Sequence, residues 1–384
     1  MKRNKQSIPR NKIAKKKFRA SMTNDELHKR SQDILQQQKE PKTKASHSSH
    51  INQFTKFCRD RGHSHPNNVT DETPNNIIAF FTHKFDAEQL SYSTIEGSRC
   101  GIRHYYENDL KCEDGWRMSE TTDKWIGNPC DSKMVKGYLT AAKKCGHRRG
   151  DRVRRAVAMR IEWLNKIYSE LNSSTKKTKT ERCYMQAANA TAHTLWVRIN
   201  ELFALRRAHL SLFKTKMIGN VIATHHDISL FFRKTTGMDD HGRTYELHKR
   251  KDDEEGACAF TLLVKWINFY ENEILERKLN DDELIFPKLD KSQGKIKLGK
   301  QMTHDDFLNL LNYWASEAGI ILIVNGEIGY FTLHCFRRGG AQHQFMFTIH
   351  GKWSISAVKW WGGWSPNKKA DAIVKHLLEE LESD

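Results

Sequence analysis

A basic stretch near the middle of the chain most constrains how its 384 residues can fold. Residues 146–155 read Gly-His-Arg-Arg-Gly-Asp-Arg-Val-Arg-Arg, with five arginines, two glycines and one aliphatic side chain. Such a segment cannot build a hydrophobic core, and it is typical of an interdomain linker, which we place at residues 147–155. The length of the chain agrees with two domains of roughly 150 residues each or somewhat more.

Net charge narrows the class of partner. The chain carries 64 Lys and Arg against 46 Asp and Glu, a formal net charge of +18. A protein this basic usually binds a polyanion, and nucleic acid is the leading interpretation. We expect no membrane partner, because the sequence has neither a run of 18 apolar residues nor an amphipathic anchor. The first residues also lack the apolar stretch that a secretory signal needs.

More than half of the excess charge lies in the N-terminal tail. Residues 1–44 hold 14 Lys and Arg against 4 Asp and Glu, and they are poor in aromatic residues. We therefore expect a basic tail over residues 1–45 with little stable structure. Its densest part, Lys12 to Arg19, is typical of a nuclear-import signal or a DNA-binding arm, and it equally fits a solvated tail without a partner. The first alternative predicts a nuclear location.

Residues 46–146 show the apolar periodicity of helices. Ile51, Phe54 and Phe57 recur at helical spacing, and a second apolar run covers 76–81. Ser91 to Thr94 supplies N-cap residues before a third helix, and a further helix is predicted over 134–142. Residues 113–131 read as a loop. This region is predicted to be a small, all-helical bundle.

Residues 156–384 combine helical and strand patterns. The pattern predicts a mainly α fold with a small antiparallel sheet, an α+β arrangement. Short β-like runs occur at 217–224, 227–233 and 243–249, and Gly237 to Gly242 reads as the turn between two of them. Helices are predicted at 157–171, 182–206, 258–276, 303–318, 334–347, 354–362 and 367–382.

Cysteine and histidine spacing favours neither a cofactor nor a metal. The eight cysteines form no Cys-x-x-Cys pair, so we interpret them as reduced thiols in the core or at the surface. The local histidine clusters are His225-His226-Asp227 and His63-x-His65. Two ligands do not close a tetrahedral site, so the sequence predicts no metal. A Gly-rich phosphate loop is also missing from the sequence.

Several segments of the second domain stand out together. One runs Arg198-Ile-Asn-Glu-Leu-Phe-Ala-Leu205, and another places Lys234 in a predicted turn between strands. A third reads Leu333-His-Cys-Phe-Arg-Arg-Gly-Gly340, and Trp360-Trp-Gly-Gly-Trp364 follows it. His334 and Arg337 are three residues apart, which puts them on one face of a helix.

These segments resemble the active-site motifs of the tyrosine recombinases, the DNA breaking and joining enzymes that include phage integrases. That family has Arg-x-x-Glu-Leu-x-x-Leu-x-x-x-Asp-Leu, then a strand-turn lysine, His-x-x-Arg with Gly-Gly, and a late His or Trp. The resemblance covers about 46–384, as a helical core-binding domain before a catalytic domain, and the last segments are most similar to fungal crypton-type mobile elements. The matching residues are Arg198, Glu201, Leu202, Leu205, Leu210, Lys234, His334, Arg337 and Trp364, while His209 replaces the aspartate.

The resemblance implies a site for one scissile phosphate. Two guanidinium groups suit its charged oxygens, which is the role implied for Arg198 and Arg337. Lys234 would protonate the leaving oxygen, although Arg233, Lys249 and Lys251 are nearby alternatives.

Three further residues of the motifs complete this prediction. His334 would bind the phosphate or carry a proton, and Trp364 would donate its indole N–H or simply pack in the core. We interpret Glu201 as a buried partner of a nearby arginine. Arg338 is expected at the surface, on a DNA backbone contact or without one.

The nucleophile that defines the family has no counterpart. No tyrosine follows Tyr330, and His376 stands where crypton-like enzymes carry the tyrosine. A phenol forms a stable phosphotyrosine, whereas an imidazole would form a more labile phosphoramidate. Three interpretations stay open: His376 acts as the nucleophile, cleavage has been lost while DNA binding is kept, or the sequence is truncated after this helix.

Three functions follow from these observations. The first is a protein of DNA integration or recombination type that clamps duplex DNA and self-associates on it as a dimer or tetramer, with strand cleavage as the ancestral chemistry. The second is a domesticated, non-catalytic DNA-binding regulator. The third is a basic scaffold for RNA or an acidic protein, which fits less well because the aromatic base-stacking platforms of RNA-binding modules are missing.

Overall fold

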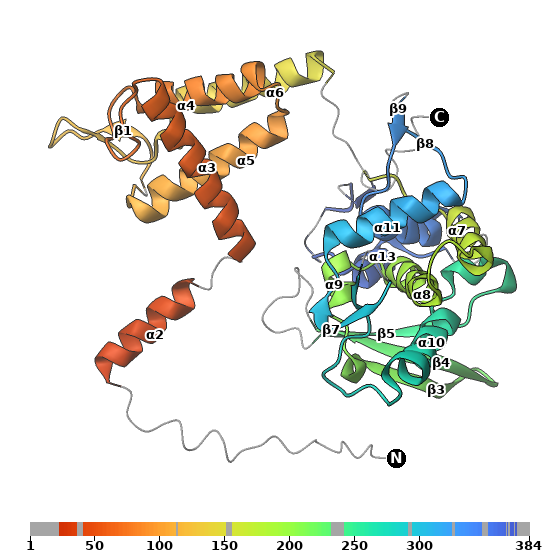
Figure 1. The fold of residues 1–384 in the computed structure, drawn as a ribbon. Helices are drawn as coiled ribbons and strands as arrows, with labels where there is room; N and C mark the ends of the chain where they lie inside the picture. The colour runs from red at the N-terminus through yellow and green to blue at the C-terminus, as the bar shows by residue number, and fades with distance from the viewer. Residues whose placement is uncertain are drawn as a thin grey trace. The chain divides into compact units, whose positions relative to one another are not determined.

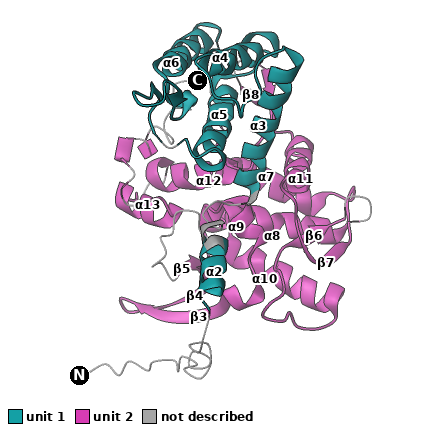
Figure 2. Cartoon of the chain, turned by 90° about the vertical axis from the view of Figure 1, so that its left-hand side faces the viewer, with its two compact units in different colours: residues 1–153 teal, residues 154–384 magenta. Residues whose placement is uncertain are grey.

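The computed structural model describes residues 23–36, 41–112, 114–150, 156–231, 242–290, 294–324, 327–347, 352–365, 367, 369–371 and 373–374. The chain divides into two compact units, residues 1–153 and 154–384 (Figure 2). Within the described ranges, no helix combines the length and the apolar character that a membrane span requires. Lys234, His376 and residues 237–241 of the predicted turn lie outside the described residues.

Helix α2, Asn24–Gln36, departs from the expectation of an unstructured tail up to residue 45. Its first turn forms a capping box, in which the Glu26 carboxylate accepts from the Thr23 backbone N–H at 2.8 Å and the Thr23 hydroxyl accepts from the Glu26 N–H. This arrangement satisfies two backbone donors that a helix start otherwise leaves unpaired. The local signal Thr-Asn-Asp-Glu therefore outweighs the low apolar content of the segment.

The rest of the first unit is the predicted helical bundle (Figure 1). Ser132 caps its last helix by accepting from the Val135 N–H at 3.2 Å. Residues 113–131, predicted as a loop, contain a minimal hairpin of two short strands and a 3₁₀ turn. The elements are α3 (Pro41–Asp60), α4 (Thr73–Thr82), a π turn (His83–Ala87), α5 (Tyr92–His104), a π turn (Tyr105–Asp109), β1 (Arg117–Met118), β2 (Trp125–Ile126), a 3₁₀ turn (Pro129–Asp131) and α6 (Lys133–Arg148). Helix α6 thus continues into the predicted linker by two residues.

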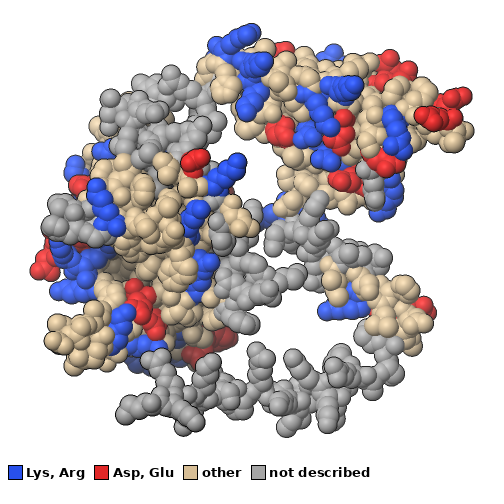
Figure 3. Space-filling model, turned by 180° about the vertical axis from the view of Figure 1, so that it is seen from behind, with Lys and Arg blue, Asp and Glu red and all other residues tan. Residues whose placement is uncertain are grey.

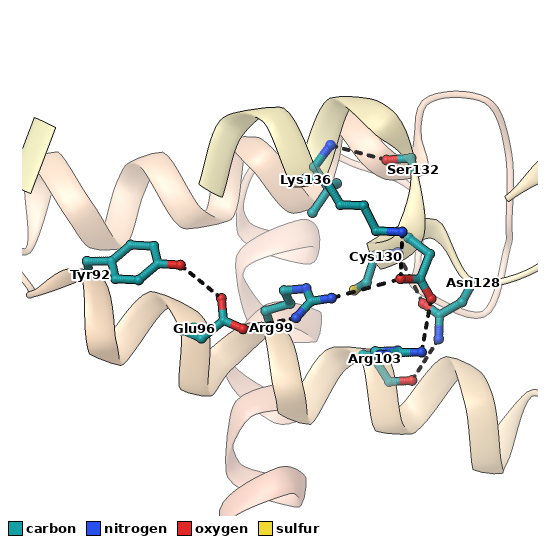
Figure 4. Close-up of polar contacts among 10 residues, drawn as sticks. Tyr92, Glu96, Arg99, Arg103, Asn128, Cys130, Ser132 and Lys136 are labelled. Atoms are coloured by element: carbon teal, nitrogen blue, oxygen red, sulfur yellow. Dashed lines mark hydrogen bonds and ion pairs between the residues drawn. The ribbon is translucent and has the colours of Figure 1, made fainter. Parts of the chain in front are cut away.

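An aromatic core and one carboxylate hold this bundle together. Phe54 of α3 packs on Phe80 of α4, with ring centroids 5.4 Å apart, and both are buried. Asp131, just before α6, pairs with Arg103 and Lys136 at 3.2 Å each and with Arg99 at 3.9 Å (Figure 4). The Asp131 cluster, meaning Asp131 with these three cations, ties α5 to the start of α6.

The second unit packs helices around one three-stranded antiparallel sheet, as the sequence predicts. Helix α8 is central and is buried along most of its length, because small residues such as Ala187, Ala188 and Ala190 let other elements approach it. Its helices are α7 (Ile161–Ser173), α8 (Lys179–Leu195), α9 (Ile199–Phe203), α10 (Ala259–Phe269), α11 (His304–Glu317), α12 (Cys335–Gln342) and α13 (Ile355–Gly362). Short 3₁₀ or π turns cover Arg207–His209, Asp252–Ala257, Tyr270–Leu275 and His343–Phe347.

The sheet has the order β3-β4-β5, with every neighbour antiparallel. β3 (Leu210–Ile218) and β4 (Val221–Leu230) form a long hairpin, and β5 (Arg243–His248) pairs on the other side of β4. Helix α10 lies against this sheet (Figure 1). Two further hairpins are made by β6 (Pro287–Leu289) with β7 (Ile296–Gln301) and by β8 (Leu322–Val324) with β9 (Glu327–Gly329).

Two boundaries in this unit differ from the sequence prediction. The runs predicted at 217–224 and 227–233 are instead the end of β3 and one continuous β4, with the turn at Gly219. The helix predicted over 182–206 breaks at Trp196, which has the left-handed dihedrals φ 49° and ψ 38°. The break separates α8 from α9 and places Arg198 at the start of the second helix.

Candidate phosphate-binding site

Arg198 stands in the turn that follows the break at Trp196. It is the N-cap residue of α9, and its backbone N–H donates to the Glu201 carboxylate at 3.0 Å. Its guanidinium Nη1 donates to the other Glu201 oxygen at 2.8 Å. The Glu201 side chain is 6% exposed and that of Arg198 is 25% exposed. The pair therefore fixes Arg198 at its base and leaves part of its side chain open to solvent.

Arg337 is a buried cation of the second unit's motifs. It lies on α12, and its residue exposure is only 4%. Its Nη1 donates to the carbonyl of Trp196 at 2.8 Å, and its Nη2 donates to the carbonyl of Gly362 at 2.5 Å. The guanidinium carbon lies 4.4 Å from the centroid of the Trp364 ring. Two carbonyl oxygens and an aromatic face thus position this positive charge.

The Gly-Gly pair after Arg338 explains how α12 reaches this position. A Cβ atom at Gly339 would lie 2.0 Å from the Met159 carbonyl oxygen. At Gly340 it would lie 2.2 Å from the Trp196 ring and 2.3 Å from the His193 carbonyl oxygen. Neither distance is possible for a side chain, so α12 can approach α8 and the Trp196 turn only with glycine at both positions.

His334 faces both arginines. It is the N-cap residue of α12, one turn before Arg337, and it is exposed. Partial desolvation lowers the pKa of its imidazole, and the positive charges of Arg337 and Arg198 lower it further. Both guanidinium groups are therefore within electrostatic reach of the imidazole. A lowered pKa favours the uncharged ring, in which one nitrogen can accept a proton while the other donates a hydrogen bond.

The structure brings together four of the six residues that the motifs single out. Arg198, His334, Arg337 and Trp364 come from three turns that are distant in sequence, and contacts or charges link all four. Lys234 and His376 lie outside the described residues, so their place relative to these four stays a prediction.

Two secondary expectations have different outcomes. Glu201 is confirmed as a buried carboxylate that pairs with an arginine, namely Arg198. The expectation for Arg338 is wrong, because this side chain is 2% exposed and donates to the Ala156 carbonyl at 2.8 Å. It fastens the beginning of the second unit to α12. Sequence spacing places Arg338 on another face than Arg337, but it does not reveal that this face is also covered.

Backbone carbonyls are the part of the site that sequence reasoning missed. The oxygens of Trp196 and Gly362 receive the Arg337 guanidinium, although their side chains suggest no such role. Trp196 has an unusual conformation for a bulky residue, and nothing in its chemistry favours a left-handed turn. The one available signal is Gly362-Gly363, where Gly363 has φ 61° and ends α13 beside Trp364.

The arrangement suits the oxygens of a phosphodiester. Arg198 and Arg337 carry charges that do not titrate near neutral pH, and guanidinium groups match the geometry of phosphate oxygens. His334 adds a neutral imidazole next to them. Elsewhere on the chain, Lys and Arg side chains are scattered among acidic ones on the face that Figure 3 shows.

Comparisons with known proteins locate the fold. No family model matches the chain, and no curated protein matches it. A solved structure of a lambda integrase dimer bound to a COC′ core site aligns with a TM-score of 0.51 at 14% identity, covering 91% of this chain and 77% of that one. A lambda integrase tetramer bound to a Holliday junction aligns with a TM-score of 0.50 at 14% identity, covering 94% and 79%. The chain therefore has the fold of the tyrosine recombinases.

Proposed function

We propose that this chain is a DNA-binding protein of the integration and recombination type, which clamps duplex DNA and holds one backbone phosphate at Arg198, His334, Arg337 and Trp364. The observation that carries the proposal is the position of Arg337. Two carbonyl oxygens and the Trp364 ring hold its guanidinium. Partial desolvation, together with the positive charges of both Arg337 and Arg198, lowers the pKa of the nearby His334 imidazole. A guanidinium positioned in this way would suit the charged oxygens of a phosphate.

Further parts of the proposal rest on sequence and resemblance. Lys234 would serve as the proton donor to the leaving oxygen, and the basic N-terminal tail favours a nuclear location. The Trp360–Trp364 segment supports a relationship to the recombinases of crypton-type mobile elements. The lambda integrase structures of similar fold, a dimer and a tetramer on DNA, support self-association on DNA as part of the proposal.

One observation favours a second candidate, a DNA-binding regulator that no longer cleaves. The sequence has no tyrosine after Tyr330, and His376 occupies the position that the resemblance assigns to the nucleophile. The two arginines, the histidine and the tryptophan of the site would still bind phosphate without a nucleophile. A regulator of this kind keeps the affinity for DNA and lacks the covalent step.

A nicked suicide substrate separates the two candidates. Cleavage by His376 would trap a covalent protein–DNA adduct on denaturing gels, and the adduct would be acid-labile, as a phosphoramidate is. The regulator forms no adduct. In the His376→Tyr variant we expect an acid-stable adduct, which the added Arg337→Lys change should suppress because a lysine cannot make the same two hydrogen bonds. Failure of His376→Tyr to form any adduct would contradict the assignment of position 376.

A comparison of the affinities for duplex DNA and for RNA tests the proposal that the chain binds DNA. We expect duplex DNA to bind more tightly than single- or double-stranded RNA of equal length across a salt series, because the proposed clamp would fit a B-form duplex and not A-form or single-stranded RNA. Equal affinity for both would favour a basic scaffold and contradict the proposed function.

A further inference from the structure

The register of the sheet in the second unit gathers a set of metal-ligand side chains. His225 on β4 is directly opposite His248 on β5, and Asp227 is directly opposite Glu246. Residues two apart on a strand share a face, so all four side chains lie on the same face of the sheet. Their neighbours His226 and Leu247 face the other way and are buried. We refer to His225, Asp227, Glu246 and His248 as the cross-strand cluster.

Distances within the cross-strand cluster match shared coordination. The His225 Nε2 lies 3.4 Å from an Asp227 oxygen, and the His248 Nε2 lies 3.4 Å from a Glu246 oxygen. Two ligands of one tetrahedral zinc ion, each bonded at about 2.0–2.1 Å, are about 3.3 Å apart. Ligand atoms of His225, Asp227 and Glu246 all lie within 4.8 Å of one another, and the two imidazole rings are 5.5 Å apart.

Burial of His225 fixes which of its ring nitrogens could bind an ion. This residue is 5% exposed, and its Nδ1 has no hydrogen-bond partner among the described residues. A buried polar atom without a partner costs about 1–3 kcal/mol and calls for an explanation. The Nε2, on the other side of the ring, lies 3.4 Å from Asp227 and is the nitrogen that would bind the ion.

Two lysines of β3 already pair with the carboxylates of the cross-strand cluster, so a cation that binds there would compete with them. Lys214 pairs with Asp227 at 2.9 Å through the oxygen that His225 does not contact. Lys216 pairs with the same Glu246 oxygen that His248 approaches. A dication that binds here keeps the Lys214 pair in place and displaces the Lys216 ammonium from Glu246.

We propose that the cross-strand cluster is a binding site for a borderline transition-metal dication of the zinc class, coordinated by two imidazoles and two carboxylates. This donor set suits Zn²⁺ better than Mg²⁺ or Ca²⁺, which prefer oxygen ligands alone. Glu246 and His248 also line a hollow with Trp196, Trp353 and Trp361. A bound ion cross-links β4 to β5. The site is separate from the phosphate site and does not depend on the proposed function.

Zinc titration of the full-length chain tests the proposal, with a chromophoric chelator as competitor and Co²⁺ absorption as a second readout. We expect one equivalent to bind tightly, with visible Co²⁺ bands of tetrahedral intensity. His248→Ala should weaken binding at least about 10-fold, a loss already seen when only a second-shell partner is removed. His248 is exposed, so this variant should fold even if His225→Ala does not. A control is the double variant His63→Ala, His65→Ala, which removes a His-x-His pair from the first unit.

Lys216→Ala provides a test with the opposite sign. If the cluster binds a dication, removal of the competing ammonium should tighten zinc binding several-fold. An ion-pair network without a metal function predicts no such gain. The proposal is overturned if wild type and His248→Ala bind zinc equally, or if the His63, His65 control loses the site instead.

Discussion

Two groups of cations in this chain are held in opposite ways. In the Asp131 cluster of the first unit, Arg99, Arg103 and Lys136 converge on one carboxylate, and Arg103 and Lys136 are well exposed. In the second unit, Arg337 is buried, and carbonyl oxygens and a tryptophan ring hold it. The cations of the first group share one carboxylate, whereas the two hydrogen bonds described for Arg337 go to carbonyl oxygens. The first group ties two helices together, and the second supports the proposed phosphate site.

The largest expected loss of stability is at Gly339, which allows the close packing of α12, the helix that carries Arg337. A Cβ there meets the Met159 carbonyl oxygen at 2.0 Å, so Gly339→Ala must push α12 away from the segment before α7. We expect a loss of about 3 kcal/mol in the free energy of unfolding, measured by urea denaturation. Gly137→Ala on α6 is the control, because no atom lies within 4 Å of a Cβ there, and it should be neutral or slightly stabilising. Equal effects of the two changes would contradict the account of the close approach.

Arg337→Ala should have the next largest effect. The change leaves the carbonyls of Trp196 and Gly362 without their donor in a buried place, which costs about 2–3 kcal/mol of folding stability. We also expect duplex DNA affinity to fall, as measured by fluorescence anisotropy. Arg337→Lys should restore little of either property, because an ammonium cannot span both carbonyls. Full rescue by lysine would show that the charge alone matters.

Asp131→Asn tests the structural role of the Asp131 cluster in the first unit. The substitution removes the charge that three cations share, and the Asp131 side chain is 18% exposed. We expect a loss of about 1 kcal/mol in the free energy of unfolding, smaller than at Arg337 and reduced further by salt. Chemical denaturation at two salt concentrations measures both quantities. A loss larger than that of Arg337→Ala would reverse the assigned roles.

The pH dependence at His334 is the smallest expected effect. Desolvation and two arginines hold the pKa of its imidazole below the ordinary 6.5. The His334 imidazole is therefore harder to protonate in the folded, DNA-free protein than in the unfolded chain. Its contribution to the free energy of unfolding is complete above pH 6.5 and declines as the pH falls below that value. A bound phosphate offsets the arginine charges and raises the pKa, so duplex DNA binding should strengthen as the pH falls from 7.5 to about 6. The His334→Asn variant should lack this dependence in anisotropy titrations.

The sequence predicts the local parts of the molecule well. Helical periodicity and turn residues indicate both units, and the His334-x-x-Arg337 spacing places two site residues on neighbouring turns. The Thr23–Glu26 capping box of α2 was also readable, although composition pointed the other way. These features depend on residues within one or two turns of each other, where chain geometry is fixed.

The parts that escape prediction depend on tertiary contacts. Trp196 adopts a left-handed turn, and its neighbour Gly340, 144 positions further along the chain, leaves room for its ring. The carbonyl partners of Arg337 follow from that turn. The cross-strand cluster is a second case, since local spacing gives His225 and Asp227 but only the β4–β5 register adds Glu246 and His248. Register and close approach are decided by the whole core, so a single sequence does not display them.

The salt dependence of duplex DNA binding by Arg198→Ala tests the central claim most directly. Arg277→Ala is the matched control, because it removes the same charge from another arginine paired with a carboxylate, at Glu283. If Arg198 contacts a backbone phosphate, its loss weakens binding to all sequences alike and lowers the slope of log K against log salt by about 1. The control should leave the slope unchanged. An unchanged slope for Arg198→Ala, or an equal change in both variants, would contradict the phosphate site.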